Sequence, residues 1–159
     1  MKTLVVYDST FGNTRVLADG MQQALGEECR VLTVSEVKPP DVEAADLLIV
    51  GSPTQGGRPT AATMRFIRGI APGGLRATHT GAFDTRLAQA EQNVGLRLLM
   101  RVIGFAAPRI ARELQARGGE MSLPPEGFIV EGKEGPLRPG ELERARSWAK
   151  RVAEQAVRS

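Results

Sequence analysis

The amino-acid sequence predicts an α/β domain built as a three-layer sandwich, with one parallel sheet between two layers of helices. Two continuous apolar runs, in Lys2–Asp8 and Asp46–Val50, are typical of strands that are covered on both faces. Strand and helix signals alternate along the chain, without a repeat or a linker. We therefore expect residues 1–159 to form a single domain.

The first strand, Lys2 to Asp8, leads through a turn rich in hydroxyl groups into a helix over about 13–25. Gly12 lets the backbone of this turn pass close to a bound group. Because the helix directs unpaired N–H groups at the turn, an anion such as a phosphate is the expected ligand. An ordinary helix cap is the alternative, since caps use the same residue types. The side chains that offer hydrogen bonds are Ser9, Thr10, Asn13 and Thr14.

The middle of the chain again predicts a buried strand followed by a loop and a helix. The alternating segment Arg30–Ser35 predicts an edge strand, and the buried strand Asp46–Val50 follows a proline pair that permits only a short helix. That strand ends in Gly51, Ser52 and Pro53, and a loop over Ser52–Arg58 follows, after which Pro59 is expected to open a helix that reaches about Ile70.

The remaining elements complete the alternation. We expect a fourth strand over Thr78–Phe83 and a fifth over Glu120–Val130, the latter in two pieces around Pro124 and Pro125. Helical periodicity before and after Gly104 and Pro108 predicts a kinked helix or two helices. The turn at 136–140 leads into a last helix with apolar positions at Leu142, Ala145, Ala149, Val152 and Ala156.

The loop after the first strand and the segment Asp46–Thr54 resemble those of flavodoxin-like FMN proteins. The phosphate loop of that family carries three hydroxyl side chains around a glycine. With Gly12 as the anchor, Ser9 and Thr14 match the outer two, and Phe11 replaces the middle one. The resemblance implies a five-stranded parallel sheet in the order 2-1-3-4-5 with helices on both faces, an order for which flavodoxin is a standard example. FMN would then bind beyond the carboxyl ends of the first and third strands.

The resemblance also implies which residues bind FMN. They lie in three loops and are Ser9, Thr10, Phe11, Gly12, Asn13 and Thr14; Pro53, Thr54, Gln55 and Gly56; and Phe83, Asp84, Thr85 and Arg86. The second loop has no aromatic residue, so a stacking partner of the family is missing there. Gln55–Gly57 forming only a mobile turn is one alternative, and a surface salt bridge between Asp84 and Arg86 is another. If Arg58 or Arg86 lies near the flavin, its charge should raise the reduction potential.

The function that the resemblance implies is electron transfer to a partner redox enzyme or a small-molecule acceptor. One alternative is an NAD(P)H- or quinone-linked FMN reductase. Another is a module that has lost FMN and serves in binding or regulation. We assign no catalytic residue and no metal site, because the sequence shows neither a nucleophile triad nor a cluster with metal-ligand spacing. His79 is expected to be a satisfied structural residue.

Composition limits the classes of partner and the location that we expect for this protein. The net charge is +3 and only 4% of residues are aromatic, which argues against nucleic-acid binding. No apolar run approaches the ~20 residues of a transmembrane helix, and a cytoplasmic location is the expectation. The single Cys29 is expected to be a buried residue at the start of a strand. The apolar face of Val94–Phe105 suits core packing or a homodimer interface, with a partner protein or an anionic membrane surface as the alternative.

Overall fold

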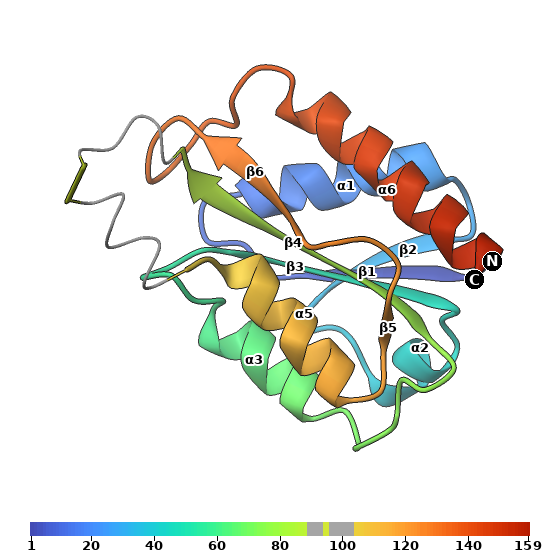
Figure 1. Cartoon of the computed structure of the whole chain (residues 1–159). Helices are drawn as coiled ribbons and strands as arrows, with labels where there is room; N and C mark the ends of the chain where they lie inside the picture. The colour runs from blue at the N-terminus through green and yellow to red at the C-terminus, as the bar shows by residue number, and fades with distance from the viewer. Residues whose placement is uncertain (89–93, 96–103) are drawn as a thin grey trace.

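The computed structural model describes residues 1–88, 94–95 and 104–159, and shows a parallel sheet with helices on both faces (Figure 1). The strands are β1 (Thr3–Tyr7), β2 (Cys29–Thr33), β3 (Leu47–Pro53), β4 (His79–Leu87), β5 (Glu120–Met121) and β6 (Glu126–Val130). The helices are α1 (Asn13–Leu25), α2 (Pro39–Glu43), α3 (Ala61–Arg68), α5 (Ala106–Ala116) and α6 (Glu141–Arg158). The predicted three-layer α/β architecture is confirmed.

The strand order is β2-β1-β3-β4-β5, as predicted. Strand β4 pairs with β5 at His79–Thr80 and with β6 at Phe83–Leu87, all in parallel. Strands β5 and β6 thus lie along one edge of β4 and share the position of the fifth strand. The prediction of a fifth strand in two pieces is confirmed, since the residues between them include Pro124 and Pro125.

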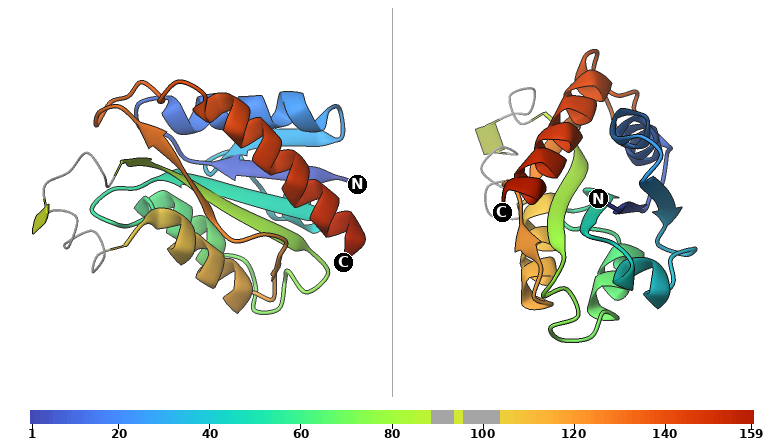
Figure 2. Two further views of the ribbon diagram at one scale, coloured as in Figure 1. Left: turned by 45° about the horizontal axis from the view of Figure 1, so that its top comes forward. Right: turned by 90° about the vertical axis from the view of Figure 1, so that its right-hand side faces the viewer.

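The two faces of the sheet are covered by different helices (Figure 2). On one side α1 packs against α6, and the core there includes Val5, Tyr7 and Trp148. On the other side α3 and α5 pack together over a core that includes Leu4 and Val6. Successive side chains of β1 therefore enter opposite cores, which is why the sequence of this strand is continuously apolar.

Two predicted boundaries are wrong. Strand β4 continues four residues past Phe83, because β6 supplies pairing partners as far as Leu87 that the sequence pattern does not reveal. Helix α3 begins at Ala61 rather than Pro59, because the side chain of Thr60 caps it and accepts a hydrogen bond from the Thr63 N–H at 3.2 Å.

Pro108 does not break the helix that contains it. Helix α5 starts at Ala106, so Pro108 lies in the first turn, where the missing N–H has no partner to lose. The apolar residues predicted for the segment before Gly104 lie, apart from Val94, outside the described residues.

The expectations for Cys29 and His79 have different outcomes. Cys29 is buried at the first position of β2, as predicted, and burial raises the pKa of its thiol to about 11. His79 begins β4, and its buried Nδ1 has no hydrogen-bond partner in the part of the chain that the structure describes, although it lies 4.0 Å from Glu120 Oε2. Over the same residues no helix is long and apolar enough to cross a membrane, and no side chains cluster as metal ligands.

Candidate functional site

A pocket of about 530 Å³ opens at the carboxyl edge of the sheet, where the chain leaves β1, β3, β4 and β6. Its volume is within the ~300–1,000 Å³ that is typical of cofactor and small-molecule sites. The lining residues are Ser9, Thr10, Phe11, Asn13, Thr14, Pro53, Thr54, Gln55, Gly56, Thr85, Arg86, Leu87, Val130 and Lys133. The loops that follow two neighbouring inner strands therefore share one cavity.

The turn after β1 presents the N-terminus of α1 to this pocket. Gly12 is the N-cap residue, with a left-handed φ of 93°, and no side chain caps the helix. The Ser9 hydroxyl accepts a hydrogen bond from the Gly12 N–H at 3.0 Å and so shapes the turn. A Cβ at Gly12 would meet no atom within 4 Å. Uncapped N–H groups, neighbouring hydroxyls and open space together fit a phosphate group.

The turn after β3 is tied to the first loop and closed on itself. Gln55 Nε2 donates to Thr10 Oγ1 at 2.8 Å. The backbones of Gln55 and Arg58 exchange two hydrogen bonds, at 2.8 and 3.1 Å, around Gly56 and Gly57. The pocket wall that this turn forms is thus built by defined hydrogen bonds, with a polar side chain bridging the two loops.

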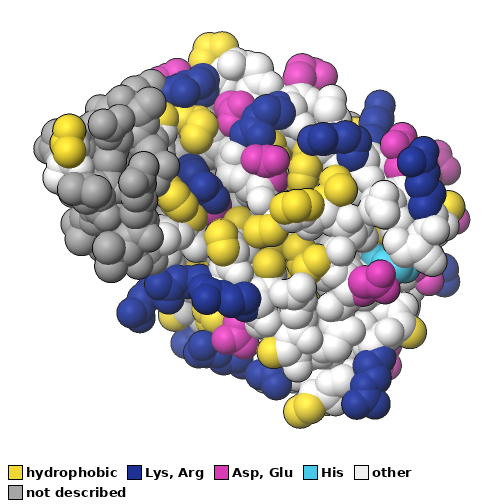
Figure 3. Space-filling view, in the orientation of Figure 1, with side chains coloured by type: hydrophobic (Ala, Val, Ile, Leu, Met, Phe, Trp, Pro, Cys, Tyr) yellow, Lys and Arg dark blue, Asp and Glu magenta, His cyan; other side chains and the backbone are white. Residues whose placement is uncertain are grey.

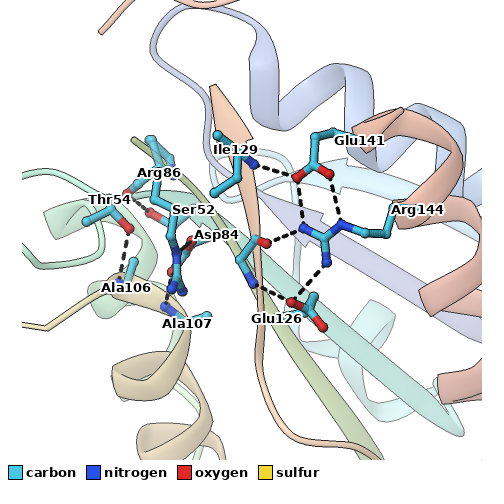
Figure 4. A network of polar contacts seen from close by, with 12 residues as sticks. Ser52, Thr54, Asp84, Arg86, Ala106, Ala107, Glu126, Ile129, Glu141 and Arg144 are labelled. Carbon is cyan, nitrogen blue, oxygen red and sulfur yellow. Dashed lines mark hydrogen bonds and ion pairs between the residues drawn. The ribbon is translucent and has the colours of Figure 1, made fainter. Parts of the chain in front are cut away.

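The end of β4 carries an ion pair (Figure 4). Arg86 donates from Nε to Asp84 Oδ1 and from Nη2 to Oδ2, both at 2.7 Å. Asp84 also accepts the Ala107 N–H at 2.8 Å, and the Arg86 guanidinium lies 3.8 Å from the ring centroid of Phe105. The Asp84 side chain is completely buried, so the expectation of a surface salt bridge is corrected to a buried one. The positive charge that Arg86 brings to the pocket is balanced.

The loop after β6 forms the far wall. Asn13 Nδ2 donates to the carbonyl oxygen of Glu134 at 3.1 Å, which fastens this loop to the start of α1. Lys133, one residue earlier, is exposed and lines the pocket. A cation therefore lies in the same cavity as the uncapped helix N-terminus, where it can add to the attraction for an anion.

A second ion-pair network holds β6 and α6 together behind this loop (Figure 4). Glu141 accepts the Ile129 N–H at 2.6 Å and two hydrogen bonds from Arg144. The hydrogen bonds from Arg144, followed by the one from Ile129, lower the pKa of the Glu141 carboxyl despite its burial. The same pairing raises the pKa of Arg144. The network thus anchors β6, which ends at Val130, to α6, and the loop with Lys133 follows directly after this strand.

Most residues predicted to bind the cofactor line the pocket, and three do not. Gly12 lies in the turn between two lining residues, Phe11 and Asn13. Asp84 is buried under Arg86. Phe83 lies in the core, with its ring centroid 6.1 Å from those of Phe128 and Trp148. The pocket lies beyond the carboxyl end of β4, so only the last three residues of this strand, Thr85, Arg86 and Leu87, line it.

The sequence reasoning missed Leu87, Val130 and Lys133. Leu87 lies in the expected third loop, Phe83 to Leu87, but was not among the residues expected to contact the cofactor. The other two lie at or after the end of β6. A usable signal existed, since the loop after a fifth parallel strand must leave the same edge of the sheet as the loops after the first and third.

The parallel sheet and the pocket at the carboxyl ends of β1 and β3 define an α/β protein built to bind a phosphate-bearing ligand. The model of the flavodoxin domain matches residues 4–94, and the chain belongs to that family. It is 41% identical over 69 residues to a flavodoxin of Aquifex aeolicus (strain VF5), and the match covers 41% of this chain and 37% of that relative. Family membership implies FMN as the cofactor.

Solved structures agree on the fold. An archaeal flavodoxin superposes with a TM-score of 0.70 over 99% of both chains at 19% identity. Oxidised flavodoxin 1 from Bacillus cereus gives a TM-score of 0.73 over 97% of this chain and 98% of that one, at 17% identity. A WrbA-like flavodoxin from Agrobacterium tumefaciens gives 0.72 over 98% and 97%, at 22% identity. These similarities establish a shared architecture.

Proposed function

We propose that this chain is an FMN-dependent electron carrier that passes electrons to a separate redox partner. The observation that carries the proposal is the single pocket shared by the uncapped start of α1 and the loops after β3 and β4. When bound, FMN supplies the one- and two-electron chemistry. The protein contributes binding, orientation and electrostatics, and no side chain is needed as an acid or base.

The residues divide into two roles. The first-turn N–H groups of α1, with the hydroxyls of Ser9, Thr10 and Thr14, would hold the phosphate, and Lys133 would add a positive charge. Two segments, Pro53–Gly56 and Thr85–Leu87, would flank the ring system. The hydrogen bond from Gln55 to Thr10 joins the two groups, so binding at one end also orders the other.

An FMN titration tests the proposal. Purified protein should be yellow or should bind added FMN with one molecule per chain, measured by the quenching of flavin fluorescence. The loaded protein should be reduced by dithionite and reoxidised by a one-electron mediator, but NAD(P)H alone should not reduce it. A colourless protein that ignores FMN would contradict the proposal and would favour the module that has lost its cofactor.

A second candidate is an NAD(P)H- or quinone-linked FMN reductase. The observation in its favour is the pocket lining, in which Phe11 is the one aromatic residue among those that the structure describes. Phe11 is itself 47% exposed. A flavin with few aromatic neighbours would leave a ring face accessible to a small substrate. Rapid reduction of the loaded protein by NAD(P)H, with no other protein present, would establish this candidate instead.

A further inference from the structure

A second groove, of about 360 Å³, lies beside the pocket between α3 and α5. Its walls carry four arginines, Arg58, Arg65, Arg68 and Arg109, next to the apolar side chains of Pro59 and Met64. The described residues that line it include no carboxylate. Lys and Arg side chains gather over the same part of the surface in the space-filling view (Figure 3). We call this groove, which is defined by its four arginines, the arginine groove.

The arginine groove adjoins the wall of the FMN pocket. Arg58 ends the turn whose residues Gln55 and Gly56 line that pocket. Thr54 Oγ1 accepts the Ala106 N–H at 3.1 Å, which holds the start of α5 against the same loop. A partner seated in the groove would therefore lie next to the cofactor.

The dipole of α3 explains two of the four charges. Arg65 and Arg68 lie in the last turn of α3, where the helix dipole favours cations, and Arg68 pairs with Glu113 at 3.2 Å. Arg58, in contrast, belongs to the loop between β3 and α3, where no helix dipole explains a cation. Like charges gathered on one surface repel one another, and an anionic partner would offset that repulsion.

We propose that the arginine groove is the docking surface for an acidic electron-transfer protein. This inference rests on the proposed function and adds the class of partner. Opposite charges would steer the partner to the groove, and the apolar Pro59 and Met64 would be covered on contact. The recognition is therefore expected to weaken as salt screens the charges.

The test measures binding without electron flow. An oxidised, acidic plant-type [2Fe–2S] ferredoxin is titrated into the FMN-loaded, oxidised protein by calorimetry, at about 10 mM and about 150 mM salt. A basic c-type cytochrome serves as the probe of opposite charge. The variant Arg65→Gln/Arg68→Gln alters the arginine groove. Its matched control, Lys150→Gln/Arg151→Gln, removes two exposed charges from α6 on the other face of the sheet.

Both variants lower the formal net charge by two from +3, so only the position of the charges differs. At low salt we expect ferredoxin to bind the groove variant roughly tenfold more weakly than the unaltered protein, and the control within about twofold. Equal losses in both variants, tighter binding of the cytochrome, or no ferredoxin binding at low salt would overturn the docking surface. FMN titration of the same samples separates this outcome from failure of the proposed function, which would appear as a protein that does not take up FMN.

Discussion

Arg86 and Asp84 lie two residues apart on β4 and form a two-pronged ion pair, with both nitrogen–oxygen distances at 2.7 Å. Residues at this spacing project from the same face of a strand, so the pairing follows from the strand itself. The carboxylate is fully buried, yet it is compensated by the guanidinium and by the Ala107 N–H at the start of α5. One carboxylate therefore neutralises a pocket residue and anchors a helix.

Replacing Asp84 by alanine should destabilise the fold strongly. The guanidinium of Arg86 would be left largely buried without a counterion, which costs about 3–5 kcal/mol. Urea unfolding of the FMN-free protein, followed by the fluorescence of the buried Trp148, measures the loss. Glu113→Ala is the control, because its pair with Arg68 is 60% exposed on the arginine side and should contribute at most about 1 kcal/mol. Similar losses in both variants would contradict this account of Asp84.

Neutralising the Asp84 carboxylate should raise the reduction potential of the bound flavin. In Asp84→Asn the charge of Arg86 is no longer balanced, and the reduced, more negative cofactor gains stabilisation. The reduction potential of the loaded variant should therefore be higher than that of the unaltered protein in a potentiometric titration. A potential that is unchanged or lower would show that Arg86 does not act on the flavin.

Gly12 should be needed for both backbone geometry and cofactor binding. Alanine at its left-handed φ of 93° costs about 1–2 kcal/mol. Gly140 offers a close match, since it is the N-cap of α6 with a φ of 91° and a Cβ there would also meet no atom within 4 Å. We expect similar losses of unfolding free energy in Gly12→Ala and Gly140→Ala, and weaker FMN binding, by roughly tenfold, only in Gly12→Ala. Equal FMN affinities would exclude a special role for this turn.

Lys133 should strengthen FMN binding through its charge. Because the side chain is exposed, Lys133→Gln is expected to weaken binding only about two- to fivefold, and less at high salt. Lys150→Gln, on the exposed surface of α6, removes the same charge away from the pocket and should leave the affinity unchanged. If the affinity of Lys133→Gln does not depend on salt differently from that of the unaltered protein, the side chain does not interact with the phosphate.

The Glu141 network predicts a pH dependence of stability. Its pKa is lowered in the folded protein, so its contribution is complete above the ordinary value of 4.5 and is lost as the pH falls through the lower, folded value. Glu141→Gln should therefore lose about 1.5–3 kcal/mol of unfolding free energy at neutral pH, and the loss should become smaller as the pH is lowered below 4.5. Glu143→Gln, which alters a side chain that is 72% exposed on the same helix, should show little difference at either pH. A loss for Glu141→Gln that does not change with pH would rule out the carboxylate as its source.

Much of the fold was predictable because its signals are local. The apolar runs of β1 and β3 are long enough to mark buried parallel strands, and the two prolines mark the interruption before β6. The loops after β1 and β3 were predicted to meet, because parallel strands carry their carboxyl ends to one edge. The structure places both in one pocket, although the contact of individual residues with FMN stays a prediction.

The features that the sequence did not predict depend on tertiary contacts. Pairing with β6 extends β4 to Leu87, and the burial of Asp84 depends on a helix that starts more than twenty residues later in the chain. Lys133 lies in a loop that Asn13, from the start of α1, contacts through the neighbouring Glu134. Such contacts join segments that are distant in the sequence, and neither hydrophobic periodicity nor residue type predicts them.

The interruption between β5 and β6 has a consequence for the molecule in a crowded solution. An outermost strand with a long row of open hydrogen-bonding groups is a template on which a second chain can align and aggregate. Here that outer row ends after the two residues of β5 and resumes only at Glu126, the first residue of β6. The residues between the two strands include prolines, which have no N–H to donate. The border of the sheet beside β4 therefore offers a foreign strand no continuous ladder to join, which protects the protein against fibril-like association.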